Sequence, residues 1–309
     1  MIHPIPSGTR DVLPDEMREL RAITETLRDV FGSRGYGEVA TPALEYEAVL
    51  TRGDPAAADP AYKLFDEHGN VLILRSDMTI PIARVVATRY ANAVPPLRFC
   101  YFAHAYRSVR PQRGQAREML QAGVELVGAP GPEGTAEAIA VLCEGLDAIG
   151  LENYRVGVGD ASLYPRLLDR LGVPAGARPQ ILHELVARDF VGLAREVEAL
   201  GHEDLVRVPQ VRGGPEVLDD VPEAGELRAV NDLLPAEVAE RVIFDLGLIR
   251  SLGYYTGPVF EVYDAAFGSP IGGGGRYDDL LGRFGRDLPA CGWAMNVERL
   301  HIARVGEGR

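Results

Sequence analysis

Residues 102–128, FAHAYRSVRPQRGQAREMLQAGVELVG, combine basic, amide, acidic and apolar side chains in a pattern that can bind a small ligand. Two apolar runs flank a loop in which Pro111 and Gly114 favour a turn. Gln121 and Glu125 lie four apart on the returning run, so in a strand they project from one face. Such a hairpin can hold a zwitterionic or anionic ligand, or it can be a solvated arginine-rich hairpin. Its arginines are Arg107, Arg110, Arg113 and Arg117.

Two further pairs of residues offer polar groups next to apolar runs. Asp77 and Thr79 in LRSDMT provide the oxygen acceptors that an ammonium group requires. They can equally mark a helix start, with Thr79 as the N-cap and Asp77 in the field of the helix dipole. Tyr254 and Tyr255 can be core residues or an aromatic wall with polar hydroxyls.

Three other patterns favour structure over chemistry. The glycine run IGGGG at 271–275 has neither a phosphate-loop nor a dinucleotide-binding spacing, so it predicts a turn or close strand packing. No histidine or cysteine cluster accompanies Asp219–Asp220 or Asp278–Asp279, so these pairs are expected to be solvated. His104 lies in an apolar run and is expected to be a core histidine rather than a base. We expect no metal site.

Composition bounds the class of protein. The 309 residues suffice for one large domain or two smaller ones, and the net charge of −13 opposes non-specific binding to nucleic acid. No apolar run approaches the roughly 20 residues that span a bilayer, and the N-terminus has no secretory signal. Three scattered cysteines indicate reduced thiols rather than a disulfide framework, so we expect a cytoplasmic protein without a membrane partner.

The hydrophobic periodicity predicts helices and short strands without regular βαβ alternation. This order favours an α+β fold built on an antiparallel sheet. Between about 162 and 239, helical patterns joined by Pro/Gly-rich stretches predict a small helical insertion. Helices are predicted over 15–35, 79–90 and 133–150, and strands around Pro42, within 61–76, on both sides of the arginine loop, and at 154–160, 240–249 and 254–263.

Taken in chain order, five segments resemble the catalytic fold of class II aminoacyl-tRNA synthetases, in the histidyl branch. PSGTRDVLPDE resembles the N-terminal signature, and GYGEVATPALEY resembles motif 1, which builds the dimer interface in that family. AYRSVRPQ and REMLQAGVELVG resemble motif 2. IRSLGYYTGPVFE resembles the second histidine motif, and GWAMNVERL resembles motif 3. The resemblance covers almost the whole chain and implies an antiparallel sheet flanked by helices.

Several departures from the synthetase motifs concern ATP. Val109 stands where motif 2 has the glutamate that helps to bind adenine, Gln115 where the loop has an arginine, and Met119 where a phenylalanine stacks on adenine. Gly253 replaces an aspartate of the second histidine motif, and Asn296 replaces a glycine of motif 3. The changes at Val109 and Gln115 remove an acceptor and a cation that would balance triphosphate charge, so ATP activation should be badly weakened.

The positions that match the amino-acid side of the synthetase pocket keep their residue types. The resemblance implies that Asp77 and Thr79 contact the α-amino group of histidine, and that Arg107 and Gln121 lie on its carboxylate side. A buried glutamate binds an imidazole N–H selectively, because an apolar competitor would leave the carboxylate unpaired. The residues expected to bind histidine are Asp77, Thr79, Arg107, Gln121, Glu125, Arg250, Tyr254 and Tyr255.

LRSDMTIPIARVVATRY and PLRFCYFAHAYR resemble a synthetase paralogue more than a synthetase: the regulatory subunit of short-form ATP phosphoribosyltransferase. This resemblance implies a non-catalytic protein of histidine biosynthesis that needs no cofactor. It implies assembly with the short catalytic subunit into a hetero-octamer that condenses ATP with phosphoribosyl pyrophosphate and is inhibited by L-histidine. Self-association through the motif 1 interface is also implied.

Two other functions stay open from the sequence. One is a truncated histidyl-tRNA synthetase-like enzyme that activates histidine or a related amino acid; the other is a tRNA-binding paralogue. The chain stops at Arg309, shortly after motif 3, where a histidyl-tRNA synthetase continues into an anticodon-binding domain. We therefore expect one synthetase-like domain over 1–309, no anticodon-binding domain and no tRNA partner.

Overall fold

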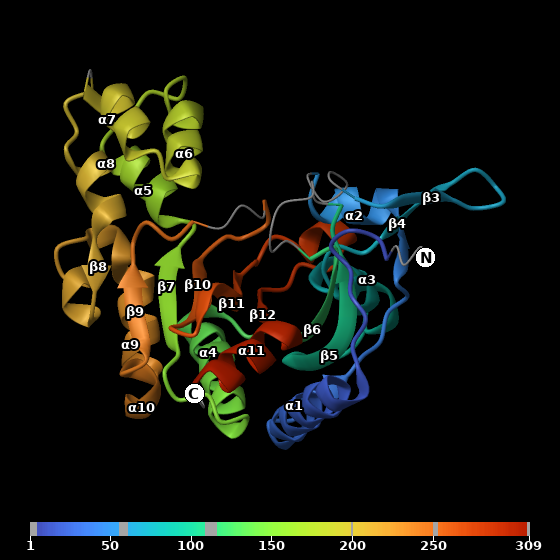
Figure 1. The fold of residues 1–309 in the computed structure, drawn as a ribbon. Coiled ribbons are helices and arrows are strands. Elements are labelled where there is room, and N and C mark those ends of the chain that lie inside the picture. The colour runs from blue at the N-terminus through green and yellow to red at the C-terminus, as the bar shows by residue number, and fades with distance from the viewer. Residues whose placement is uncertain (1–4, 56–60, 109–115, 199, 250–252, 308–309) are drawn as a thin grey trace.

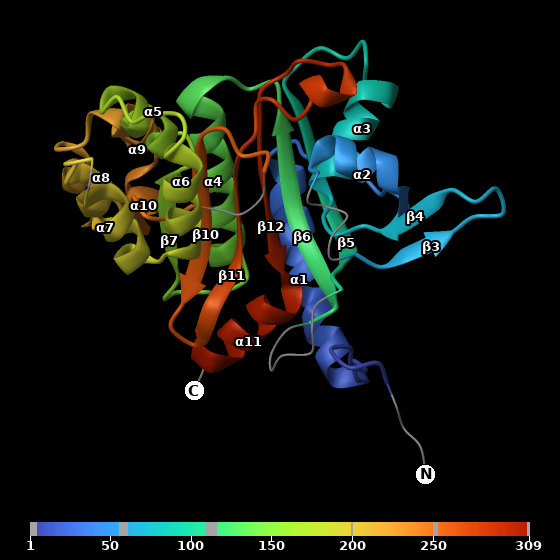
Figure 2. The same cartoon turned by 90° about the horizontal axis from the view of Figure 1, so that it is seen from above.

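A nine-stranded, mostly antiparallel sheet forms the centre of the molecule, with the strand order β1-β5-β6-β12-β11-β10-β7-β9-β8 (Figures 1 and 2). The computed structural model describes residues 5–55, 61–108, 116–198, 200–249 and 253–307. Only the pairs β1–β5 and β7–β9 are parallel. The predicted α+β class with an antiparallel sheet is therefore confirmed. The strands are β1 (Gly37–Glu38), β5 (Leu97–Tyr106), β6 (Glu118–Val127), β7 (Arg155–Asp160), β8 (Arg212–Gly213), β9 (Val242–Asp245), β10 (Pro258–Asp264), β11 (Phe267–Arg276) and β12 (Ala290–Asn296).

The long hairpin of β5 and β6 positions the side chains that the sequence singled out. Its register pairs Leu97 with Val127 and Tyr106 with Glu118, so the arginine loop joins the two strand ends as predicted. Because side chains alternate along a strand, the residues 122, 124 and 126 join the large apolar core, whereas Gln121 and Glu125 share the opposite face.

Two long helices cover the core face of the sheet. These are α1 (Pro14–Ser33) and α4 (Gly131–Ala148), and two residues after the end of each lies a glycine in the left-handed region: Gly35 has φ +78° and Gly150 has φ +82°. Trp293 of β12 anchors the layers, because its indole N–H donates to the Ala138 carbonyl at 2.9 Å and its ring packs edge-on against Phe31.

Two groups of elements lie at opposite ends of the large sheet (Figures 1 and 2). At one end, the short helices α2 and α3 pack near a second sheet of three strands with the order β2-β4-β3. At the other end lie the helices between β7 and β9. The first group comprises β2 (Leu44–Tyr46), α2 (Glu47–Gly53), β3 (Lys63–Phe65), β4 (Val71–Leu74) and α3 (Thr79–Arg89).

The residues between β7 and β9 are mostly helical, with the short strand β8 among them, and the C-terminal helix follows β12. The α-helices are α5 (Leu163–Arg170), α6 (Arg178–Ala187), α7 (Phe190–Glu198), α8 (Asp204–Arg207), α9 (Gly225–Leu233), α10 (Ala236–Ala239) and α11 (Val297–Glu307). The 3-10 helices are η1 (Val208–Gln210), η2 (Pro215–Leu218), η3 (Pro222–Ala224) and η4 (Gly282–Phe284).

The structure decides between the alternatives at two local patterns. For the glycine run at 271–275, close strand packing is confirmed and a turn is not found: the run is part of β11, and a Cβ on Gly274 would lie 2.0 Å from the Gly292 carbonyl oxygen. Thr79 is not the N-cap of α3, because Met78 occupies that position. The carboxylate of Asp77 instead accepts the Ile80 backbone N–H at 3.1 Å, which frees the Thr79 hydroxyl for another partner.

Candidate functional site

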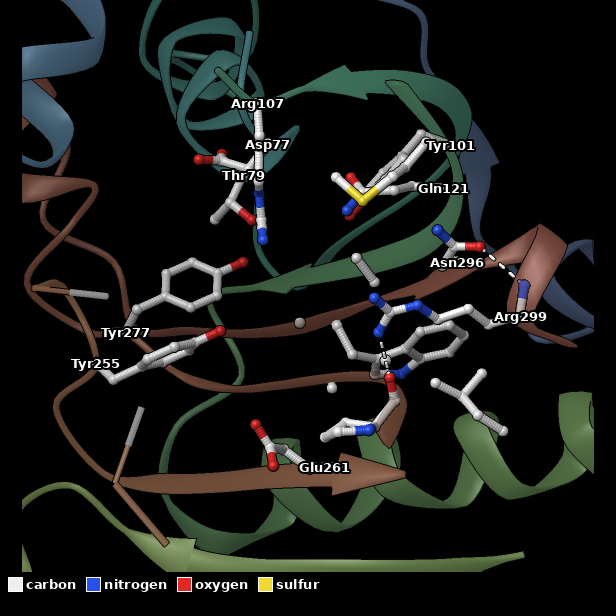
Figure 3. A pocket seen from close by; sticks show the side chains of 18 of the residues that line it. Asp77, Thr79, Tyr101, Arg107, Gln121, Tyr255, Glu261, Tyr277, Asn296 and Arg299 are labelled. Carbon is white, nitrogen blue, oxygen red and sulfur yellow. Dashed lines mark hydrogen bonds between the residues drawn. The ribbon is translucent and has the colours of Figure 1, made fainter. Parts of the chain in front are cut away.

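A cavity of about 260 Å³ opens beside β6, β10, β11 and β12 (Figure 3). It is smaller than the roughly 300–1,000 Å³ of pockets for drug-sized ligands, which fits a small metabolite. Arg250, Val109 and Gln115 lie outside the described residues. Of the residues expected to bind histidine, those that line the cavity are Asp77, Thr79, Arg107, Gln121, Tyr254 and Tyr255.

Glu125 lies behind the wall of the cavity, with 1% of its surface exposed. Its Oε1 accepts a hydrogen bond from the Thr79 hydroxyl at 2.7 Å, and its Oε2 accepts one from the Tyr277 hydroxyl. Both donors line the cavity, so they connect the buried carboxylate to a bound ligand. Burial raises the pKa of Glu125 to about 8, although the hydrogen bonds from Tyr277 and Thr79 act in the opposite direction.

Glycines make room for this carboxylate within the sheet. Gly292 of β12 lies directly opposite Glu125 in the register of β6. A Cβ at Gly292 would come 1.9 Å from the Glu125 Oε2, which is impossible without displacing the carboxylate. Gly123 plays the same part for Tyr101, whose hydroxyl would lie 2.4 Å from a Cβ at that position. The small residues therefore belong to the site although they carry no functional group.

Asp77 adds a second carboxylate to the same part of the cavity. Loss of hydration raises its pKa, and the hydrogen bond from Ile80 and the charge of Arg107 oppose this rise. The negative charge of Asp77 also raises the pKa of Glu125. Two neighbouring carboxyl groups that are short of water favour a ligand with hydrogen-bond donors or positive charge.

Two arginines provide the cavity with positive charge, and one of them, Arg107, acts on Asp77. Figure 3 shows the side chains of Arg107 and Arg299 directed into it from different elements. The Arg299 guanidinium packs over the Phe267 ring at 5.4 Å and donates to the Pro270 carbonyl. Burial, and then the positive charge of Arg107, lower the pKa of Arg299. A cavity that offers both carboxylate and guanidinium groups suits a zwitterion such as an amino acid.

Asn296 helps to hold the cationic part of the cavity in place. Its side-chain oxygen accepts the Arg299 backbone N–H at 2.9 Å, which caps the first turn of α11 (Figure 3). Asn296 also pairs with Gln121 in the register of β12 and β6, so two amides lie side by side in the cavity wall. Met119, which is 8% exposed, lies in the same wall.

Comparisons with known proteins agree with this architecture. The family model for histidyl-tRNA synthetase matches residues 8–300. A chain from Moorella thermoacetica named ATP phosphoribosyltransferase regulatory subunit is 40% identical, over 97% of this chain and 82% of its own length. One of the same name from Symbiobacterium thermophilum is 39% identical, over 98% of this chain and 80% of its own. This chain belongs to the family of ATP phosphoribosyltransferase regulatory subunits.

Solved structures place this regulatory-subunit family on a histidyl-tRNA synthetase-like fold. A crystal structure from Bacillus halodurans C, described as an ATP phosphoribosyltransferase regulatory subunit/histidyl-tRNA synthetase, superposes with a TM-score of 0.90 at 29% identity. The superposition covers 98% of this chain and 84% of that one. A histidine–tRNA ligase subunit from Alicyclobacillus acidocaldarius gives a TM-score of 0.79 at 31% identity, covering 100% and 98% of the two chains.

Sequence reasoning missed three hydroxyl- or carboxyl-bearing members of the cavity wall in this regulatory-subunit chain: Tyr101, Glu261 and Tyr277. Tyr277 directly follows the glycine-rich strand β11, and the spacing of those glycines carries no signal for a polar site residue next to them. The expectation that His104 is a core histidine was wrong, because its side chain is exposed. It follows the strand alternation of its neighbours, where Ala105 points inward and is fully buried.

Three further observations concern the wider molecule. Among the described residues, no group of three or more His, Cys, Asp or Glu side chains is arranged to hold a metal ion. In the same part of the chain, no helix is long and apolar enough to cross a membrane. Cys100, Cys143 and Cys291 are buried free thiols, and burial raises the pKa of each thiol.

Proposed function

We propose that this chain regulates ATP phosphoribosyltransferase by binding L-histidine in the cavity, without catalysing a reaction itself. The observation that carries the proposal is the buried carboxylate of Glu125, held by hydroxyls from Thr79 and Tyr277. Asp77 lies on the same wall for an α-ammonium group, and Arg107 provides a cation for an α-carboxylate. An imidazole N–H of the ligand can then form a hydrogen bond within the group of Glu125, Thr79 and Tyr277. An apolar side chain would leave this polar group without a partner on the ligand.

Feedback inhibition requires that histidine bind the inhibited state of the complex more tightly than the active state. The proposed assembly with the short catalytic subunit is a hetero-octamer. In it, histidine binding to this chain affects the catalytic subunit through contacts at the interface between the subunits. Two surfaces are candidates for that interface: the helical insertion at about 162–239 and the arginine loop between β5 and β6. The central part of the loop lies outside the described residues.

Calorimetry and activity assays test the proposal together. Histidine should bind the purified chain, and Glu125→Ala and Tyr255→Ala should abolish this binding. Glu237→Ala on α10, an exposed position outside the cavity, is the control and should bind like the wild type. Adding the chain to a short ATP phosphoribosyltransferase should raise its turnover and make it sensitive to histidine. Unchanged binding in both cavity variants would refute the pocket assignment.

The alternative, an amino-acid-activating enzyme, gives a different result in one assay. If the chain catalysed histidine-dependent exchange of pyrophosphate into ATP, the regulatory function proposed here would be wrong. The net charge of −13 supports the absence of a tRNA partner, and the three buried thiols support a cytoplasmic location. We also propose that residues 1–309 form one synthetase-like domain.

The small sheet supports self-association through the motif 1 segment. On one of its faces, Leu44 (42% exposed), Tyr46 (49%) and Leu64 (43%) form an apolar surface, because the register pairs each of them with Leu72 or Leu74. A second copy of the chain is the proposed partner of this face. Light scattering should give a dimer for the wild type and a monomer for Tyr46→Lys; a dimeric Tyr46→Lys with unchanged dissociation would contradict this interface.

A further inference from the structure

Ionisable side chains gather where the helical insertion at about 162–239 adjoins the large sheet (Figures 1 and 2). Two of them belong to the sheet, at the ends of β7 and β11, and four belong to α5, η3 and α9. None of these six described side chains lines the cavity. We call this group the seam; it consists of Asp160, Arg166, Arg170, Glu223, Glu226 and Arg276.

Asp160 holds the insertion against the end of β7. Its side chain is fully buried, and its Oδ1 accepts the Ser162 backbone N–H at 2.8 Å and the Ser162 hydroxyl at 2.6 Å. Its Oδ2 accepts a hydrogen bond from the Arg166 Nη2 at 2.6 Å, and the same nitrogen donates to the Glu223 carbonyl at 2.7 Å. One guanidinium group therefore fastens both α5 and η3 to a buried carboxylate of the sheet.

Arg170, one turn after Arg166 on α5, extends the seam into the insertion. Its Nε donates to the Glu223 carboxylate, whose side chain is 5% exposed. Its Nη2 donates to the Asp204 carboxylate of α8 at 3.3 Å. Ion pairs therefore join α5, η3 and α8, so that these three elements depend on the position of α5.

Glu226, at the start of α9, faces the sheet from the insertion. A Cβ on Gly257 would lie 3.5 Å from the Glu226 Oε1 and 3.3 Å from the Arg276 Cδ, so the two side chains meet beside this glycine. Burial raises the pKa of Glu226 and the charge of Asp160 raises it further, whereas the charges of Arg276 and Arg166 oppose this rise. The Glu226 carboxyl group therefore interacts with charges on both sides of the seam.

Backbone hydrogen bonds connect the seam to the wall of the cavity. Tyr255 and Tyr277 line the cavity, and each is next to a residue of this connection. The Thr256 backbone N–H donates to the Arg276 carbonyl at 2.9 Å, and the Thr256 hydroxyl accepts the Asp278 backbone N–H at 2.9 Å. The segments 255–257 and 276–278 are therefore cross-linked, and a ligand that contacts either tyrosine acts on both.

Arg276 and Gly257 carry this connection to the insertion. The Arg276 guanidinium is buried and donates to the carbonyls of Gly131 at 3.0 Å and Ala129 at 3.1 Å, which fixes its orientation. The Gly257 carbonyl accepts the backbone N–H of Ala161, which lies between β7 and α5, at 2.9 Å. A continuous set of contacts thus runs from the cavity wall through the seam to α5 and α9.

We propose that the seam couples the cavity to the helical insertion, so that a ligand in the cavity orders α5 and α9. This inference rests on the proposed function, which identifies the ligand as L-histidine, and it selects the part of the chain through which the effect leaves the cavity. Because coupling is reciprocal, a partner that orders the insertion raises the affinity for histidine by the same factor.

The seam suits such a role because its charges are unequally buried. The side chains of Arg166 and Arg170 are each 42% exposed, so water can hydrate them when α5 opens. The Asp160 carboxylate is fully buried and is left without its cation in the same event. The closed arrangement is therefore favoured by a limited free energy, as a segment with local opening requires.

The experiment is hydrogen–deuterium exchange of the full chain, read by mass spectrometry, with and without saturating L-histidine. Arg166→Met tests the seam, because it removes the donor to Asp160 and Glu223 but keeps an apolar stem of similar length. The control is Arg178→Met, which breaks an ion pair with Asp169 inside the insertion. Calorimetry on the same samples measures histidine binding to each protein.

Histidine should slow exchange in β6 and β11 in all three proteins. In the wild type and Arg178→Met, it should also slow exchange in α5 and α9 about fivefold or more. In Arg166→Met, α5 and α9 should exchange at the same rate with and without histidine, although calorimetry still detects binding. This combination separates a loss of coupling from a loss of the ligand.

The other outcomes overturn one claim or the other. Equal protection of α5 and α9 in the wild type and Arg166→Met would overturn the seam as the route, and so would loss of this protection in Arg178→Met as well. If Arg166→Met does not fold, the wild type decides: histidine that protects β6 and β11 but neither α5 nor α9 would overturn the coupling. A wild type that does not bind histidine would overturn the proposed function and this inference with it, whereas the earlier outcomes leave the proposed function standing.

Discussion

The replacement Glu125→Gln should stabilise the ligand-free protein while weakening histidine binding. An acid whose pKa is higher in the folded state than in the unfolded state favours folding less as pH rises, because unfolding then releases its proton. For Glu125 the pKa changes from 4.5 to about 8, so stability is retained below pH 4.5 and lost progressively up to pH 8. At about 1.4 kcal/mol per pH unit, the loss reaches about 5 kcal/mol.

Glutamine has nearly the same shape but does not titrate. Its oxygen can accept the Thr79 hydroxyl, and its amide can donate to the oxygen of Tyr277, so both partners of Glu125 stay satisfied. The variant and the wild type should therefore be similar in stability at pH 5, and Glu125→Gln should be more stable by several kcal/mol at pH 8.5. Histidine affinity should fall about 10- to 150-fold, because a hydrogen bond to a charged acceptor contributes about 1.5–3 kcal/mol.

Urea unfolding of both proteins without histidine at pH 5, 6.5 and 8.5 measures the change in stability, and calorimetry measures the binding. Glu137→Gln is the matched control, because its effect on the dependence of stability on pH should have the opposite sign. The hydrogen bond from Arg98 is the largest of the effects that lower the pKa of Glu137, so that pair stabilises the fold above the unfolded pKa and its contribution is lost only as pH falls. A Glu125→Gln protein with the same dependence of stability on pH as the wild type would refute the reasoning.

Two further substitutions probe the same wall. Gly292→Ala places a Cβ 1.9 Å from the Glu125 carboxylate, so calorimetry should detect no histidine binding, and the urea midpoint should fall; wild-type affinity would show that the sheet relaxes around the methyl group. Asp77→Asn should weaken histidine binding about 10- to 100-fold but leave the binding of imidazole-4-propionate, which has no α-ammonium, unchanged; equal losses for both ligands would place the ammonium elsewhere.

The sequence predicted the site best where one element carries several of its residues. The period of two along β6 places Gln121 and Glu125 on one face, and the structure has both on the side of the cavity. Local rules failed where distant contacts decide. Thr79 reads locally as a helix cap, yet its hydroxyl donates to Glu125, 46 positions away, and Tyr277 reaches the same carboxylate across 152 positions.

The glycine run of β11 shows what the sequence left open in the fold. Glycine is a poor strand former by propensity, so IGGGG is compatible with a turn as well as with close strand packing. In the structure, Cβ atoms on Gly272 and Gly274 would lie 2.4 Å and 2.0 Å from carbonyl oxygens of β12, and only glycine permits this close approach. Such a constraint arises from the neighbouring strand, which no local window of sequence contains.

The energetic cost of burying the Glu125 carboxyl group gives the proposed regulation its physical basis. Both hydrogen-bond donors to Glu125 are neutral hydroxyls, and the nearby charge of Asp77 raises its pKa further, so the free protein holds an unfavourable buried acid. A ligand that brings an imidazole and an ammonium relieves this cost only while the wall of Thr79, Glu125 and Tyr277 keeps its geometry. That wall joins α3, β6 and the end of β11, so any state of the complex that moves these elements apart must bind histidine less tightly. By linkage, histidine then favours the state in which they stay together.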